Sequence, residues 1–172
     1  PGSANAINPM ELRLGTGEQP QMALAGKVQW LMRFFSLLMP DLSGEEELLL
    51  DAAILQTYRD FGVPCGNGNQ PILADLLERL QSLTGTARIV RLLERFVSGS
   101  ARIFNQQTNV SLDNKYTVLD ISELTGDLLT VGMFVALDFV WDKAKENRTE
   151  EKAIFIDECW QLIGASSNRQ AA

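Results

Sequence analysis

Apolar residues recur every three or four positions through the first half of the chain, the spacing of amphipathic helices. One apolar stripe covers residues 24–39, and Pro40 ends it. A second helix is predicted to begin after Ser43, because Glu46 stands three residues further on and completes the spacing of a capping box. That helix should run to about Phe61.

Two further helices are predicted beyond a Gly- and Asn-rich loop. Pro71 suits the first turn of the third helix, whose apolar face reaches Leu83. Gly85 separates it from a fourth helix, which Gly99 ends. The short connections indicate that residues 24–99 form a compact, antiparallel, all-helical sub-domain.

Beyond residue 99, the spacing of apolar residues is no longer that of amphipathic helices. Residues 116–121 are β-branched and apolar and predict a short buried strand. A long helix, apolar on nearly all sides, is expected over about 124–147, and residues 153–156 predict a second buried strand. This order predicts a right-handed βαβ unit with parallel strands, and because two such strands make no stable sheet alone, the unit should belong to a larger α/β domain.

The predicted fold class is therefore α/β and helix-rich. Residues 1–23 are expected to be an N-terminal coil, residues 24–99 the helical sub-domain, and residues 100–172 part of an α/β domain. The chain is 45% hydrophobic and 22% charged, which is ordinary for a folded globular protein.

The amino-acid composition excludes several kinds of catalytic and metal-binding site. The sequence contains no histidine, so histidine acid–base and triad catalysis are excluded, and the separated Cys65 and Cys159 do not make a zinc site. We interpret both thiols as reduced and the compartment as cytosolic. The net charge of −7 argues against a dedicated nucleic-acid surface, although not against a local basic patch. No apolar run is long enough to cross a bilayer.

Two acids follow the second predicted strand, giving Ala153-Ile154-Phe155-Ile156-Asp157-Glu158. Four apolar residues and then Asp-Glu form the Walker B pattern, because ligands of open α/β sheets bind at the carboxyl ends of strands. Asp157 would hold Mg²⁺ through its water shell, and Glu158 would orient and polarise the attacking water. A buried strand followed by two solvated acids would give the same string.

A phosphate-binding loop of the form G-x-x-x-x-G-K-[ST] does not occur in the 172 residues. Gly26-Lys27 is followed by Val28 and lies within the first predicted helix, so it does not fit. On its own, the chain is expected not to turn over ATP.

One basic feature stands apart from this motif. Arg88, Arg91 and Arg95 fall on one face of the fourth predicted helix. They are suited to contact DNA or a partner subunit, while a solvated helix face is the plainer interpretation.

Several runs occur in the order found in one family, the TraC/TrbE-like ATPases that energise conjugative DNA transfer and type IV secretion. The chain resembles this family over nearly its whole length. The runs are Ile7-Asn8-Pro9-Met10, Ser43 to Asp51, Arg102 to Asn105 with Thr108-Asn109-Val110, Val118 to Ser122, and Ile156 to Trp160.

The resemblance implies a RecA-like P-loop NTPase motor domain interrupted by the all-helical sub-domain. It also implies that the chain starts after the family's phosphate loop and stops before its downstream glutamine and arginine motifs. ATP and Mg²⁺ would be cofactors of the full-length protein, with none bound to this fragment. The full-length protein would be a homo-oligomer with other secretion subunits as partners, cytoplasmic and peripheral to the inner face of the membrane.

Two classes of function follow. In the first, the chain is an internal fragment of such an ATPase. In the second, it is a noncatalytic helical interaction module of a secretion or conjugation complex. An upstream phosphate loop in the full gene would favour the first, and its absence would favour the second.

Overall fold

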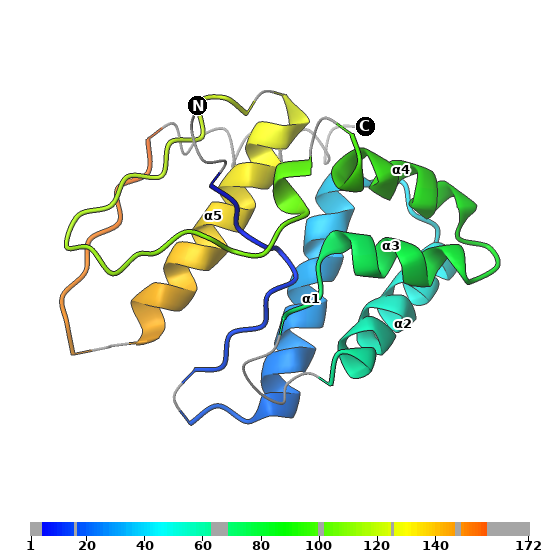
Figure 1. The fold of residues 1–172 in the computed structure, drawn as a ribbon, viewed down its shortest axis with the longest axis horizontal. Coiled ribbons are helices and arrows are strands. Elements are labelled where there is room, and N and C mark those ends of the chain that lie inside the picture. Colours follow the sequence, from blue (N-terminus) through cyan, green and yellow to red (C-terminus); the bar gives the residue numbers. More distant parts are fainter. Residues whose placement is uncertain are drawn as a thin grey trace. The chain divides into compact units, whose positions relative to one another are not determined.

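The computed structural model contains five α-helices and one short 3-10 helix in the stretches that it describes (Figure 1). These stretches are residues 5–15, 17–62, 69–99, 102–124, 126–146 and 149–157. The helices are α1 (Pro20–Leu38), α2 (Gly44–Asp60), α3 (Leu73–Gln81), α4 (Ala87–Val97), η1 (Arg102–Phe104) and α5 (Asp127–Glu146). The contacts divide the chain into unit 1, Pro1–Ser111, and unit 2, Leu112–Ala172.

The helices of unit 1 begin and end where their terminal residues require. Pro20 opens α1, and Pro40 lies just beyond its end. At the start of α2, the backbone N–H of Glu46 donates to Ser43 Oγ at 3.3 Å, and the backbone N–H of Ser43 donates to Glu46 Oε2 at 2.9 Å. Gly62 follows α2 with a φ of +64°, a conformation that glycine adopts without strain. The predicted capping box is confirmed.

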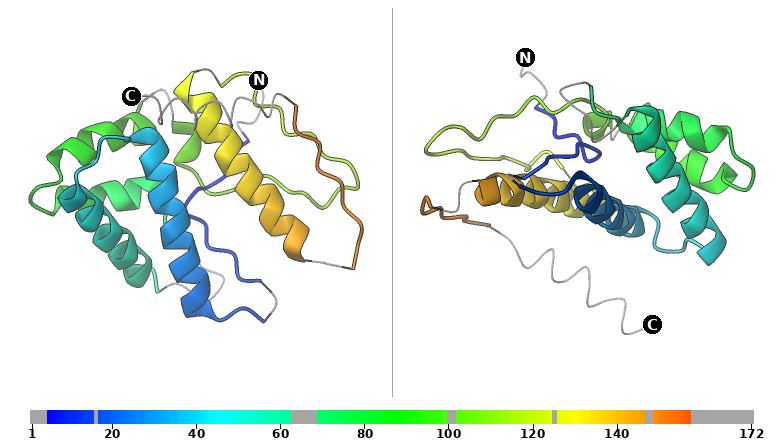
Figure 2. Two further views of the ribbon diagram at one scale, coloured as in Figure 1. Left: turned by 180° about the vertical axis from the view of Figure 1, so that it is seen from behind. Right: turned by 90° about the horizontal axis from the view of Figure 1, so that it is seen from below.

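Successive helices of unit 1 pack against one another, α1 on α2, α2 on α3 and α3 on α4, as the views in Figure 2 also show. Their apolar stripes meet in a core, and burying each leucine or phenylalanine there is worth roughly 1.5–3 kcal/mol. The fully buried large side chains include Leu31, Phe34, Phe35, Leu50, Ile54, Leu73, Leu76, Leu80, Ile89 and Leu93. The four helices that the spacing predicted here are confirmed to within a few residues at each end.

In unit 2, the long helix that the sequence predicted is α5. Val131 and Met133 are both buried, although two positions apart in a helix lie on nearly opposite sides. The prediction that this helix is covered on more than one face is therefore confirmed. Among the described residues, no helix has the length and apolar character needed to span a membrane.

The prediction of a RecA-like βαβ unit is wrong. Within the described residues there is no strand and no sheet, so the fold is helical rather than α/β. Residues 116–121 and 153–156, predicted as buried strands, lie outside any helix and lack strand pairing. A strand satisfies its backbone only by pairing with a neighbour, and the described residues supply none. Tyr116 and Phe155 are accordingly 83% and 92% exposed.

Candidate functional site

Of the predicted acidic pair, the described residues include Asp157 and not Glu158. Asp157 lies at a turn that follows residues 151–156, which are outside any helix, and it is exposed. Glu158 falls outside the described residues. The roles predicted for the two acids therefore remain predictions, and what the structure adds is that Asp157 is open to solvent.

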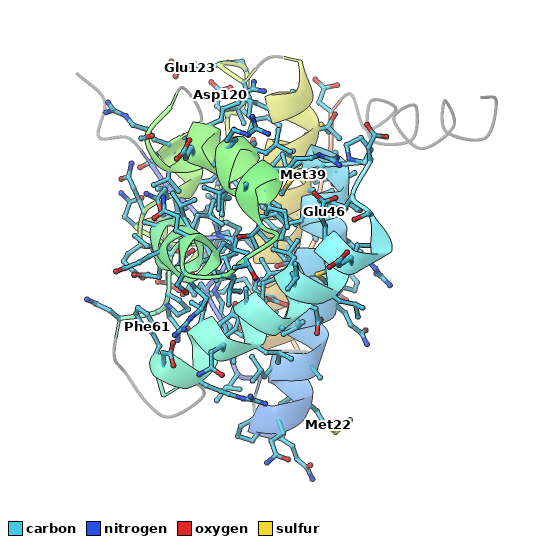
Figure 3. All side chains as sticks on the ribbon, turned by 90° about the vertical axis from the view of Figure 1, so that its right-hand side faces the viewer. Met22, Met39, Glu46, Phe61, Asp120 and Glu123 are labelled. Atoms are coloured by element: carbon cyan, nitrogen blue, oxygen red, sulfur yellow. The ribbon has the colours of Figure 1, made fainter. Side chains whose placement is uncertain are left out.

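A second acid of unit 2, Asp120, is held by local hydrogen bonds. The backbone N–H of Ser122 donates to Asp120 Oδ1 at 2.9 Å. This bond, together with one from the Ser122 hydroxyl, holds the pKa of Asp120 below its ordinary value of 3.8. Asp120 is therefore an exposed carboxylate that is ionised at neutral pH, and Figure 3 labels it together with Glu123.

The metal ligands available to Asp157 indicate which cation it could hold. In the part of the chain that the structure describes, no three acids or cysteines are grouped closely enough to hold a metal ion. Mg²⁺ does not need such a cage, because it keeps several waters and takes one or two carboxylates together with substrate phosphates. A single exposed aspartate fits Mg²⁺ held through water, and does not fit a structural metal.

Lys143 of α5 forms ion pairs with two acidic side chains. Its Nζ lies 2.9 Å from Glu146 Oε2 and 3.0 Å from Asp113 Oδ1. The hydrogen bonds to Glu146 and then Asp113 raise the pKa of Lys143 above its ordinary value of 10.5. This cluster neutralises itself, and so it offers no free cation for a phosphate.

In unit 1, the structure brings two of the motif runs together. The backbone N–H of Ala6 donates to Asn109 Oδ1 at 2.7 Å, and the backbone N–H of Asn109 donates to the carbonyl of Ala6 at 3.1 Å. The backbone N–H of Asn8 donates to Thr108 Oγ1 at 3.0 Å, and the Thr108 hydroxyl donates to Glu11. Residues about a hundred positions apart are joined by these bonds.

Asn8 and Tyr58 anchor the same segment from inside. The buried Asn8 amide donates to the carbonyl of Pro71 at 2.9 Å and accepts from the backbone N–H of Met10 at 3.0 Å. The buried Tyr58 hydroxyl donates to the carbonyl of Met10 at 2.6 Å. Burial raises the pKa of Tyr58, so its hydroxyl stays protonated and serves as a donor. These polar residues hold the N-terminal segment against α2 and the start of α3.

The run around η1 has a comparable role. Asn105 Oδ1 accepts from the backbone N–H of Ala74 at 2.8 Å, near the free start of α3. The ring of Phe104 is buried, with its centroid 6.4 Å from that of Phe96 in α4. No role for Asn8, Tyr58 or Asn105 followed from the sequence. Asn8 and Asn105 stood out only as members of the family runs, and Tyr58 carried no signal.

Comparisons with known proteins were made against family models, curated proteins and solved structures. No family model and no curated protein matches the chain. The solved structure of VirB4 from Thermoanaerobacter pseudethanolicus superposes with a TM-score of 0.81 at 26% sequence identity, over 94% of this chain. The chain spans 66% of the length of that VirB4 chain. This similarity confirms the resemblance to the ATPases of conjugative transfer and type IV secretion that the ordered motifs predicted.

Proposed function

We propose that the chain is an internal part of an ATPase that energises conjugative DNA transfer or type IV secretion. The observation that supports this most is the likeness to VirB4, which extends over 94% of the chain at 26% identity. The ordered motif runs supply a second and independent support. Other subunits of a secretion complex would then be its partners at the inner face of the membrane.

The chemistry proposed for this part belongs to the two adjacent acids. Asp157 would hold the hydration shell of Mg²⁺, and the ion would neutralise charge on the phosphates of ATP. Glu158 would accept a hydrogen bond from water and orient it toward the terminal phosphate. The exposure of Asp157 suits this role, because a water-coordinated cation must be able to reach the carboxylate.

The first test uses the chain as it is. Because no G-x-x-x-x-G-K-[ST] loop occurs in it, we expect no phosphate release from Mg-ATP and no rise in melting temperature with Mg-ATP. A clear, saturable thermal shift would mean that these residues bind the nucleotide without such a loop.

The second test uses the full-length parent protein. Glu158→Gln keeps the size and removes the charge, so turnover should fall by about a hundredfold or more while nucleotide affinity stays within a fewfold. Glu151→Gln is the matched control, because Glu151 is an exposed acid seven positions earlier in the same segment. Turnover retained in Glu158→Gln would remove this residue from the proposed role.

A noncatalytic interaction module is the alternative, and the helices of the described residues favour it. The two proposals differ in the parent protein. A module predicts a parent that neither binds nor hydrolyses ATP, together with normal secretion in Glu158→Gln. An ATPase predicts loss of secretion in the same variant, measured as substrate transfer between cells.

A further inference from the structure

Helix α4 presents a basic face to solvent, formed by Arg88, Arg91 and Arg95. These arginines follow one another at intervals of three and four residues, so they lie on one side of the helix, and all three are exposed. The opposite side is buried in unit 1 through its apolar residues, Ile89, Leu93 and Phe96. Figures 1 and 2 show α4 at the edge of unit 1.

Two of the three arginines add nothing to the folded structure that the contacts reveal. Arg88 has partners, because its Nη1 lies 3.2 Å from Glu46 Oε2 and its Nη2 donates to the carbonyl of Asp41 at 2.7 Å. Within the described residues, Arg91 and Arg95 have no ion-pair partner. Like charges four positions apart destabilise a helix slightly. This pair therefore lowers the stability of α4 without a compensating contact in that part of the chain.

The other described helices do not gather their cations in this way. Helices α2 and α3 contain one arginine each. On α1, Lys27 and Arg33 are six positions apart and so lie on different sides. On α5, Lys143 and Lys145 each form an ion pair with an acid of the same helix. A row of arginines on one side is thus particular to α4.

Both ends of α4 are fixed to unit 1. Before its first turn, the buried Thr86 hydroxyl donates to the carbonyl of Leu80 at 2.6 Å. At its end, the Asn105 amide donates to the carbonyl of Val97 at 3.4 Å. Because the helix backbone is already held in place, a partner that binds the arginines does not have to order it. The basic face is therefore a pre-formed surface.

The spacing of the arginines determines the spacing of the groups that they could bind. A helix rises 1.5 Å per residue, so the backbone positions of Arg91 and Arg95 are about 6 Å apart along the axis. A second helix has the same rise, and its carboxylates three and four positions apart would repeat at the same distances. Guanidinium groups bind carboxylates through paired hydrogen bonds. An acidic helix lying along α4 would thus match the basic face.

Two neighbouring residues distinguish such a helix from other anions. Leu92 is 40% exposed next to Arg91, and an apolar side chain of a partner helix can cover it, whereas a row of phosphates cannot. Glu94 is exposed on the same helix, and it repels any surface that is negative throughout. The chain as a whole has a net charge of −7, which also disfavours an extended polyanion such as DNA or an anionic membrane.

We propose that the basic face of α4 is a docking site for an acidic amphipathic helix of a partner protein. Carboxylates of that helix would bind Arg91 and Arg95, and an apolar side chain would cover Leu92. The occupant follows from charge complementarity, and because the face is open to water, the interaction is weak and sensitive to salt. The proposal does not depend on ATP hydrolysis, so it applies to both functions considered above, and its test contains no nucleotide.

The probe is a synthetic acidic peptide of about 18 residues, long enough to form a helix alone. Its glutamates are spaced three and four positions apart along one side, with a leucine beside them. It is titrated into the isotope-labelled 172-residue chain, and the amide resonances are followed by NMR. In about 0.05 M salt we expect saturable shifts at Ala87–Val97, and in about 0.5 M salt an affinity lower by about tenfold or more.

Variants of the chain assign the binding to the two unpaired arginines. Arg91→Gln/Arg95→Gln should weaken peptide binding by about tenfold or more, because it removes both unpaired cations. Arg33→Gln/Arg59→Gln is the matched control, since it makes the same change in net charge at two exposed arginines outside α4. This control should bind within about twofold of the wild type. The amide spectra also show directly that each variant is folded.

A variant with the opposite effect separates docking from a general loss of structure. Glu94→Gln removes a like charge beside the bound glutamates and should strengthen peptide binding by about two- to threefold. Glu123→Gln makes the same change at an exposed acid of unit 2 and should leave the affinity unchanged. A merely destabilised α4 would not bind the peptide more tightly.

Three results overturn the proposal. The first is the absence of shifts in α4 when the glutamate peptide is added to the wild type. The second is equal shifts with a peptide in which glutamine replaces every glutamate. The third concerns the other occupants: if single-stranded DNA or anionic lipid vesicles move the same resonances at lower concentration than the peptide, and Arg91→Gln/Arg95→Gln abolishes this, then α4 is a nucleic-acid or membrane surface.

Discussion

The helices of unit 1 and the extended segments of unit 2 were both predicted to be buried, and only the helices are. Leu76 and Leu93 of unit 1 are fully buried, as their three- and four-residue spacing indicated. Residues 116–121 and 153–156 are just as apolar, yet Val118 is 68% exposed. The same hydrophobic content therefore led to opposite outcomes in the two units.

The difference lies in where each element finds its hydrogen bonds. A helix pairs its own backbone within four residues, so an apolar stripe needs only a neighbouring surface. A strand needs a second strand at its side, and a buried parallel strand needs one on each side as well as covered faces. An apolar sequence thus predicts a strand only when its partners are present, and the described residues contain none.

Core truncation gives the largest expected contrast between the two units. Phe34 is fully buried. Its ring centroid lies 5.2 Å from that of Phe35 and 5.7 Å from that of Trp30. Phe34→Ala should lower the free energy of unfolding by about 3–5 kcal/mol, because it leaves a cavity among these rings. Urea unfolding followed by circular dichroism at the helix band measures it.

The matched change in unit 2 is Phe155→Ala. Since Phe155 is 92% exposed, the same substitution should change the free energy of unfolding by less than about 0.5 kcal/mol. If Phe34→Ala does not fold at all, Phe34→Leu supplies a milder comparison at the same position. Equal losses at the two phenylalanines would mean that residues 153–156 are buried in solution.

The sequence was sufficient for the helices because their signals are local. Ser43 with Glu46 marked the start of α2, using only residues within one turn of that boundary. The outcome for residues 116–121 depended instead on which strands would lie beside them, and a local pattern does not contain that information.

The next contrast concerns a buried hydroxyl. Tyr58→Phe leaves the carbonyl of Met10 without its 2.6 Å hydrogen bond in the core, and should cost about 1–3 kcal/mol. Tyr116→Phe makes the same chemical change at a residue that is 83% exposed, and should cost less than about 0.5 kcal/mol. A comparable loss for both, measured by urea unfolding, would show that Tyr116 is also enclosed.

The network around Tyr58 also shows what sequence analysis missed. Asn8 was visible only as part of a family run, yet its buried amide joins segments 63 positions apart. No local pattern distinguishes such an asparagine from one in an exposed turn, because its donors and acceptors are satisfied by distant backbone groups. Polar residues in family motifs therefore include positions that maintain structure, and the site cannot be read from the motifs alone.

A smaller effect is expected at the helix cap. Ser43→Ala removes the hydroxyl that accepts from the backbone N–H of Glu46, and should lower the free energy of unfolding by about 1 kcal/mol. Ser36→Ala is the control, because the Ser36 hydroxyl only donates within α1 and alanine favours a helix. The two melting temperatures, compared with wild type, measure the difference, and a Ser43→Ala variant as stable as Ser36→Ala contradicts the role of the cap.

The smallest expected effects concern how the free energy of unfolding depends on pH. They test unit 1 in acid and unit 2 in base. The backbone N–H of Ser43 holds the pKa of Glu46 below its ordinary 4.5, so folding lowers this pKa. Its stabilisation is present above pH 4.5 and is lost as the pH falls through the lowered value. Lys143 in unit 2 has a raised pKa, so its stabilisation is present below pH 10.5 and is lost as the pH rises through the raised value.

Glu46→Gln and Lys143→Gln turn this difference into a measurement. Glu46→Gln should be less stable than wild type near neutral pH, and the gap should close as the pH falls through the lowered pKa of Glu46. Lys143→Gln should show its gap at neutral pH and lose it only as the pH rises through the raised pKa of Lys143. Because screening weakens ion pairs, about 0.5 M salt should shrink both gaps. A Glu46→Gln gap that persists in acid would mean that the amide lacks a packing contact made by the glutamate side chain, rather than its charge.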